Sequence, residues 1–141
     1  MSEALAYARA ELETGVFTCV LRRGTRTLTS VERGVKPLLD WLDAGTDLHG
    51  FSAADRVVGN GAAFLYVLLG VEELYANVLS HAAAETLERN GIRVTYGTLV
   101  ETIQNRQKTG SCPIEEAVKG EADPHAALAK IRERLKELKK S

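Results

Sequence analysis

A strand, a helix and a second strand follow one another directly in the middle of the chain, and this order constrains the fold most strongly. Glu73 to Ser80 has few polar positions, as expected for a strand at the centre of a parallel sheet. Ser80 can cap the helix predicted for His81 to Asn90, and Gly91 stands where a left-handed residue ends a helix. Apolar residues then alternate from Ile92 to Tyr96, which predicts the next strand. The segment indicates an α/β fold.

The rest of the chain adds a hairpin and further helices. Val16 to Arg22 and Thr25 to Ser30 are rich in β-forming residues, and Arg23-Gly24 between them is typical of a two-residue hairpin turn. Helices are predicted for Ser2 to Glu13, Val35 to Ala44, Pro113 to about Lys119, and the segment after Asp123-Pro124, where Leu128, Ile131, Leu135 and Leu138 have helical spacing. Helices of this number would cover both faces of the sheet in three layers. We therefore predict a single domain over residues 1–141, with a terminal amphipathic helix at 123–140.

Ser52-Ala53-Ala54-Asp55 matches the capping-box pattern of a helix start, with Asp in place of Glu at the last position. The helix predicted to follow, Ala53 to Leu69, is apolar on nearly all sides and should be covered by other elements. Gly59, Asn60 and Gly61 interrupt it, although each glycine costs a helix about 1 kcal/mol relative to alanine. Close packing of helix and sheet explains the glycines, whereas a buried Asn60 amide needs hydrogen-bond partners.

A loop of varied chemistry leads into the helix at Pro113. It contains the amide of Asn105, the guanidinium of Arg106, the thiol of Cys112 and, just inside the helix, the carboxylate of Glu115. Such groups beside a helix N-terminus favour a ligand that is anionic or contains a carbonyl group. A short helical turn is predicted before the loop, at 99–104.

Composition excludes several classes of function. The net charge of −1 argues against nucleic acid as a partner, because phosphate binding usually needs a clear basic excess. The longest apolar run, Val57 to Val71, is interrupted by glycines and at about 15 residues is short for a membrane span. Met1 to Ala10 lacks the apolar core of a signal peptide. Cys19 and Cys112 are most simply reduced thiols. We therefore expect a soluble cytoplasmic protein without a membrane partner.

Segments spread over the chain share their order and residues with one family. They are Ala54 to Gly59, Val71, Tyr75-Ala76, Ser80, Gly91-Ile92, Tyr96, Asn105-Arg106 and Cys112 to Val118. With these segments, the chain from about Phe17 to Lys119 resembles small prokaryotic proteins grouped as Domain of Unknown Function family 1893. That family is similar in fold to cytidine deaminases, which implies a mixed sheet in an α/β/α arrangement but no established reaction. Many relatives are expected to have a lysine in place of Asn60, so no charge-based role is transferred to this position.

The resemblance in fold does not extend to the zinc chemistry of deaminases. Zinc deaminases need His or Cys followed by x-Glu at one helix start, and Pro-Cys-x-x-Cys at the next. The corresponding helix starts here are Ser52-Ala53-Ala54-Asp55 and Ser80-His81-Ala82-Ala83. The histidines and cysteines of the chain do not have the spacing of zinc ligands either: His49, His81, His125, Cys19 and Cys112. We expect neither a metal nor a cofactor.

The candidate residues around the loop also have purely structural explanations. Cys112 precedes a helix start that favours a thiolate, but Glu115 and Glu116 in the same turn oppose that effect. A small buried cysteine that ends the loop is a slightly simpler interpretation. Asn105 can cap local backbone, and Arg106 can pair with a nearby glutamate instead of binding a ligand carboxylate or phosphate.

The candidates at helix starts have similar alternatives. Asp55 is most simply a capping-box residue, although it could lie at the mouth of a deaminase-like pocket. Ser80 is explained as an ordinary N-cap and His81 as an exposed residue of the first turn. Their functional interpretation is that ligands of open α/β sheets bind where strands end and helices begin.

Three functions remain open at this stage, and the sequence does not say whether a reaction is catalysed. The first is binding of a nucleotide- or nucleoside-like small molecule in a zinc-free, deaminase-like cleft. The ligand-binding residues would be Asp55, Gly59, Asn60, Ser80, His81, Asn105, Arg106 and Glu115. The second is a transferase or hydrolase with Cys112 as the catalytic nucleophile. The third is a non-catalytic interaction module or homo-oligomer.

Overall fold

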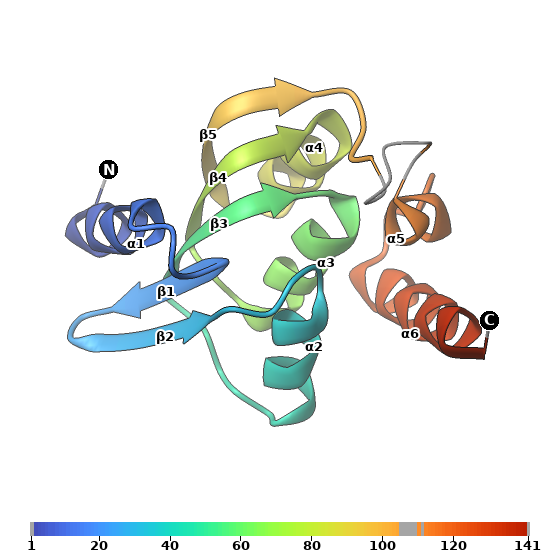
Figure 1. Ribbon diagram of the computed structural model, residues 1–141, viewed down its shortest axis with the longest axis horizontal. Coiled ribbons are helices and arrows are strands. Elements are labelled where there is room, and N and C mark those ends of the chain that lie inside the picture. The colour runs from blue at the N-terminus through green and yellow to red at the C-terminus, as the bar shows by residue number, and fades with distance from the viewer. Residues whose placement is uncertain (1, 105–109, 111, 141) are drawn as a thin grey trace.

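The computed structural model describes residues 2–104, 110 and 112–140. These residues form a mixed α/β fold around one open sheet of five strands (Figure 1). The strands are β1 (Cys19–Arg23), β2 (Arg26–Ser30), β3 (Ser52–Val58), β4 (Glu73–Ser80) and β5 (Arg93–Val100). The helices are α1 (Glu3–Glu13), α2 (Lys36–Asp43), α3 (Asn60–Leu69), α4 (His81–Arg89), α5 (Pro113–Ala117) and α6 (Pro124–Lys140).

The strands lie in the order β2-β1-β3-β4-β5, and the sheet is mixed. β1 is antiparallel to both β2 and β3, whereas β3, β4 and β5 are parallel. The predicted hairpin is confirmed with its turn one residue further along, since Arg23 pairs with Arg26 around Gly24-Thr25. The predicted strand–helix–strand unit is confirmed as β4, α4 and β5, and Gly91 has the expected positive φ of 78°.

The largest difference from the sequence prediction is that Ser52 to Val58 form a strand rather than the first half of a helix. The capping box ending at Asp55 is therefore wrong, and the helix begins only at Asn60. β3 lies between β1 and β4, and Ala53 and Ala54 are fully buried. A central strand covered on both faces has a continuous apolar sequence, which periodicity cannot distinguish from a buried helix.

The helical turn predicted at 99–104 is wrong, because β5 extends to Val100 and residues 101–104 form no helix. Leu99 pairs with Leu79 of β4, and Val100 pairs with Ser80. Pairing with the neighbouring strand thus overrides the local preference of these residues.

Helices pack on both faces of the sheet. On one face, Leu5, Ala8 and Leu12 of α1 form a small apolar cluster with Val20 and Tyr75 of the sheet. On the other face, α2, α3, α4 and α6 contribute to one large cluster that includes the strand residues Cys19, Leu21, Ala53, Leu74 and Ala76. Neighbouring strand residues such as Val20 and Leu21 belong to different clusters, as the alternation of side chains in a strand requires.

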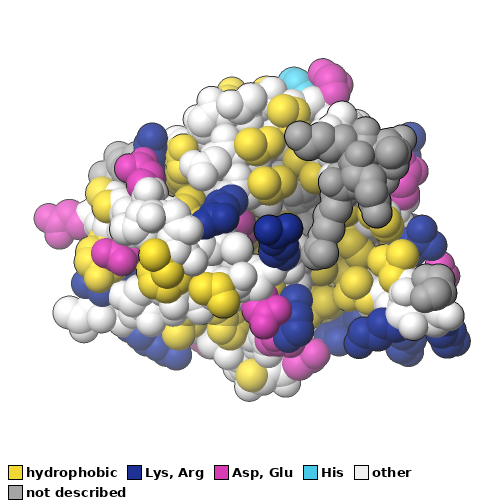
Figure 2. Space-filling view, viewed as in Figure 1, with side chains coloured by type: hydrophobic (Ala, Val, Ile, Leu, Met, Phe, Trp, Pro, Cys, Tyr) yellow, Lys and Arg dark blue, Asp and Glu magenta, His cyan; other side chains and the backbone are white. Residues whose placement is uncertain are grey.

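The terminal helix α6 packs on α3 at the side of the sheet where β3, β4 and β5 end (Figure 1). Ile131 is fully buried there, whereas Leu138 near the end of the predicted apolar stripe is 40% exposed. Basic side chains gather on the outer surface of this helix (Figure 2). The predicted amphipathic character of the helix is confirmed, with its apolar side in the core.

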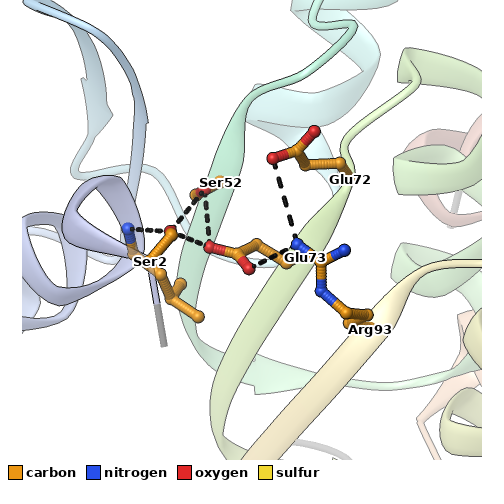
Figure 3. A network of polar contacts seen from close by, with 6 residues as sticks. Ser2, Ser52, Glu72, Glu73 and Arg93 are labelled. Carbon is orange, nitrogen blue, oxygen red and sulfur yellow. Dashed lines mark hydrogen bonds and ion pairs between the residues drawn. The ribbon is translucent and has the colours of Figure 1, made fainter.

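The buried carboxylate of Glu73, at the start of β4, links α1 to the sheet (Figure 3). Glu73 is 4% exposed and accepts hydrogen bonds from the Ser52 hydroxyl at 2.9 Å, the Arg93 guanidinium at 2.9 Å, and the Ser2 hydroxyl. Ser2 also caps α1 by accepting the N–H of Leu5 at 3.0 Å. Burial alone would raise the pKa of Glu73, but the bonds from Ser2, Arg93 and Ser52 outweigh it and hold the pKa below its ordinary value.

Replacing this carboxylate should loosen α1. We expect Glu73→Ala to lower the free energy of unfolding by about 1–2 kcal/mol, because the hydroxyls of Ser2 and Ser52 lose their common acceptor. Glu72→Ala is the matched control. The Glu72 side chain is 53% exposed, and its ion pair with Arg93 is long, at 4.0 Å, so its loss should cost little. Urea unfolding followed by circular dichroism measures both, and equal midpoints for the two variants would contradict the expectation.

Candidate functional site

The first turns of α3 and α4 lie beside each other at the carboxyl ends of the parallel strands β3 and β4, and a pocket of about 190 Å³ opens there. The described residues that line it are Asn60, Ser80, Ala82, Glu101, Thr102, Glu115, Glu116, Lys119 and Gly120. Ligands of open α/β sheets bind preferentially at this end of parallel strands. The pocket is therefore the first candidate for a functional site.

The start of α3 is capped by a carboxylate from a distant part of the sequence. Glu115 of α5 accepts hydrogen bonds from the backbone N–H groups of Asn60, at 2.7 Å, and Gly61, at 3.0 Å. The N-cap residue of α3 is Gly59, which has no side chain to do so. The negative charge of Glu115 also suits the positive end of the helix dipole.

The two glycines around Asn60 are explained by the close approach of α5. A Cβ on Gly59 would lie 2.4 Å from Glu115 Oε1, and a Cβ on Gly61 would lie 2.5 Å from Ile114 Cγ2. Close packing was predicted as the reason for these glycines, but with the sheet as the neighbour. The neighbour at these positions is instead α5, because the glycines stand at the start of a helix and not in its interior.

Three further contacts lie at the helix starts. The Asn60 side chain is 9% exposed, and its Oδ1 accepts a hydrogen bond from the Thr86 hydroxyl of α4. Ser80 caps α4 as predicted, since its hydroxyl accepts the N–H of Ala83 at 3.1 Å. His81 is exposed in the first turn of α4, with Nε2 at 3.3 Å from a Glu101 oxygen.

Asp55 lies elsewhere, within β3, and is not among the described residues that line the pocket. Its carboxylate accepts a hydrogen bond from the Tyr66 hydroxyl at 2.7 Å, and the same hydroxyl interacts with the Cys19 thiol. Burial raises the pKa of Asp55 to about 6, against the lowering effect of the Tyr66 hydrogen bond. Burial likewise raises the pKa of the Cys19 thiol, and the neighbouring Asp55 charge adds to that increase.

The remaining candidates come from the loop before α5. Cys112 is half-buried at the N-cap of α5, and its backbone N–H donates to the carbonyl of Ile103 at 2.9 Å. It is not among the described residues of the pocket. Asn105 and Arg106 lie outside the described residues, so their predicted roles stay predictions.

The two thiols should differ strongly in reactivity, because Cys19 is 2% exposed and Cys112 is only half-buried. We expect an aromatic disulfide reagent to modify about one thiol per native chain, at Cys112, and both thiols only after denaturation. The released thiolate is measured by absorbance, with Cys112→Ser as the control that should remove the native reaction. Native modification of both thiols would show that Cys19 is accessible, and modification of neither would remove Cys112 as a nucleophile.

A second and larger pocket, of about 360 Å³, lies near the opposite end of the sheet. Turns that precede β3, β4 and β5 contribute to it, and the described residues that line it are His49, Gly50, Val67, Gly70, Val71, Glu72, Asn90, Gly91 and Ile92. The smaller pocket is the better candidate despite its size, because two helix starts and the carboxyl ends of parallel strands meet there.

Two negative findings apply to the part of the chain that the structure describes. Its histidines, cysteines and acidic residues do not form a group of three or more that could hold a metal ion. None of its helices combines the length and apolar character needed to cross a bilayer.

Part of the pocket lining was not predicted from the sequence. Thr86, Glu101, Thr102, Glu116 and Lys119 were not selected as site residues, although each of them lies in the pocket or contacts Asn60. No motif marks them, because they belong to four different segments. Thr86 follows the predicted helix start at Ser80 and lies on the helix side that faces α3, but its own sequence context does not mark it.

The fold and the pocket define an α/β protein with an open mixed sheet and a polar site at the carboxyl ends of its parallel strands. The chain belongs to the family described as domain of unknown function DUF1893, whose model matches residues 7–135. This confirms the predicted family, over a longer segment than 17–119.

Comparison with known proteins extends this result only at the level of fold. A solved structure of a DUF1893 family protein from Thermotoga maritima is similar, with a TM-score of 0.83 and 21% sequence identity. The likeness covers 97% of this chain and 92% of that chain. No curated protein matches the sequence.

Proposed function

We propose that this protein binds a nucleotide- or nucleoside-like small molecule, in the cytoplasm, at the pocket between the starts of α3 and α4. The observation that supports it is that Asn60, Ser80 and Glu115, selected from separate parts of the sequence, line the same pocket. Amide, hydroxyl and carboxylate groups of this kind hydrogen-bond to the polar edges of bases and sugars.

The deaminase-like fold that the sequence resemblance implies would place a site at the same location. It implies a site at two successive helix starts, and the helix starts after β3 and β4 both border the pocket. Their sequences, Gly59-Asn60-Gly61 and Ser80-His81-Ala82, lack the motifs of zinc deaminases, so the proposal does not include zinc. A pocket of about 190 Å³ accommodates a base or a sugar rather than a large cofactor.

A thermal-shift panel of nucleosides and nucleotides tests the proposal. A ligand present at ~100 times its Kd should stabilise the native state by about 2.7 kcal/mol and raise Tm by several degrees. Ala82→Trp should abolish the shift, because the exposed Ala82 lines the pocket and the indole would fill it. Ala10→Trp, at an exposed position of α1, is the matched control and should retain it.

Two outcomes would count against the proposal. One is that no member of the panel stabilises the wild type at millimolar concentration. The other is that Ala82→Trp binds as tightly as the wild type, which would place the ligand outside this pocket. The alternatives predicted from sequence, a Cys112-dependent enzyme and an interaction module, would then be tested next by active-site labelling and light scattering.

A further inference from the structure

We propose that the pocket selects an uncharged or cationic ligand that presents N–H donors, and that it disfavours ligands with a phosphate or carboxylate group. The inference rests on the proposed function and specifies the charge class of the ligand. Four features of the site support it.

The anion position at the start of α3 is already filled by the chain itself. The N–H groups of Asn60 and Gly61 both point to Glu115, at 2.7 and 3.0 Å. The fit is close, since even a Cβ on Gly59 would lie 2.4 Å from Glu115 Oε1. A phosphate that approached these N–H groups would have to displace a carboxylate that they bind well.

The start of α4 has acceptors of its own as well. The Ser80 hydroxyl accepts the N–H of Ala83 at 3.1 Å. A Glu101 oxygen lies 3.3 Å from Nε2 of His81. The positive ends of both helices, which usually attract anions, therefore face oxygens from this chain.

The charges that the described residues bring to the pocket are mostly negative. Among its described lining residues, the carboxylates of Glu101, Glu115 and Glu116 outnumber the single ammonium of Lys119. Glu101 is 89% exposed, so solvent screens its charge. The carboxylate of Glu115 is half-buried, and its charge is therefore screened less. A phosphate with about two negative charges would be repelled by this group.

The same oxygens can bind a donor. A carboxylate can accept about four hydrogen bonds, and from the described residues Glu115 receives two, both from the backbone of α3. The free capacity of Glu115, together with Glu116 and the Thr102 hydroxyl, suits an exocyclic amino group or an ammonium group.

Isothermal titration calorimetry with matched pairs tests the inference. The probes are cytidine, adenosine, guanosine and uridine, each against its 5′-monophosphate, at pH 7.5 and low salt. At least one nucleoside should bind ten or more times as tightly as its monophosphate. Raising the salt concentration should reduce that ratio, because the discrimination is electrostatic.

Two substitutions test whether the charge of Glu115 causes the preference for a nucleoside over its monophosphate. Glu115→Gln keeps an oxygen at the start of α3 but removes the charge, and should reduce the ratio to about threefold. Glu133→Gln removes the same charge from an exposed position of α6 outside the pocket, and should leave the ratio unchanged. If Glu115→Gln does not fold, Glu116→Gln replaces it, since Glu116 is exposed, lines the pocket and should lower the ratio to a smaller extent.

The possible results separate this inference from the proposed function. A monophosphate that binds as tightly as its nucleoside, or more tightly, overturns the charge selection while leaving the ligand site intact. Such a result would also agree with the anion-binding role predicted for Arg106. Absence of binding by every probe overturns the proposed function and the charge selection together.

Discussion

Glu115→Ala should destabilise the protein by about 3 kcal/mol, although Glu115 is only half-buried in a helix of five residues. The substitution leaves the N–H groups of Asn60 and Gly61 without an acceptor, and both residues are buried. An unpaired buried donor costs about 1–3 kcal/mol, and the first turn of α3 also loses a negative charge at its positive end. Gly59 offers no side chain that could replace the lost cap.

Glu116→Ala is the matched control for this experiment. It removes the same side chain from the next position of α5, where it is exposed, whereas the N–H groups of Asn60 and Gly61 donate to Glu115. We expect a change within about 0.5 kcal/mol for this variant. Urea unfolding of both proteins gives the difference, and similar losses for the two would mean that the Glu115 contact contributes little in solution.

Asp55→Asn should stabilise the protein at neutral pH by about 2 kcal/mol. Burial raises the pKa of Asp55 from 3.8 to about 6, so at neutral pH the native state holds a charge in an unfavourable environment. A shift of this size corresponds to about 3 kcal/mol, which partial exposure of the residue reduces. Asparagine retains an oxygen that can accept the hydrogen bond from Tyr66, at 2.7 Å in the wild type.

The raised pKa of Asp55 determines how the stability of the wild type changes with pH. Because the folded protein binds the Asp55 proton more tightly than the unfolded chain, the wild type is most stable below pH 3.8 with respect to this group. That stability is lost as the pH rises from 3.8 through about 6. The advantage of Asp55→Asn should therefore be absent near pH 4 and fully developed above pH 7.

Denaturant unfolding at several pH values measures this difference. Asp40→Asn removes the same formal charge from an exposed side chain of α2 and should not stabilise the protein at neutral pH. A difference between Asp55→Asn and the wild type that stays constant from pH 4 to pH 7 would mean that Asp55 does not titrate in this range.

Much of the fold follows from local sequence. The strand at Glu73 to Ser80, the Ser80 cap and the positive φ of Gly91 were predicted, because each depends on residues close in sequence. The hairpin was also predictable, since a glycine turn lies between two β-rich segments. The strand at Ser52 to Val58 was not, because two alanines and two valines suit either a buried strand or a buried helix.

The candidate site was only partly predictable for a related reason. Asn60, Ser80 and Glu115 attracted attention through local irregularities: an amide in an apolar run, a cap and a carboxylate in a first helical turn. Their convergence depends on contacts such as the one from Glu115 to Asn60, which spans 55 positions in the sequence. Thr86 and Lys119 gave no local signal, since an ordinary helical threonine or surface lysine has the same sequence context.

The sequence alone determined the α/β class and the helix after β4, because caps, turns and alternating patterns act over a few residues. Only the tertiary structure decided that Ser52 to Val58 would be a strand, since β1 and β4 pair with its two edges in the sheet. The tertiary structure also decided that Glu115 would cap α3, because neither Gly59 nor Asn60 specifies a partner from the far end of the chain. Long-range packing selects among local alternatives that are close in free energy.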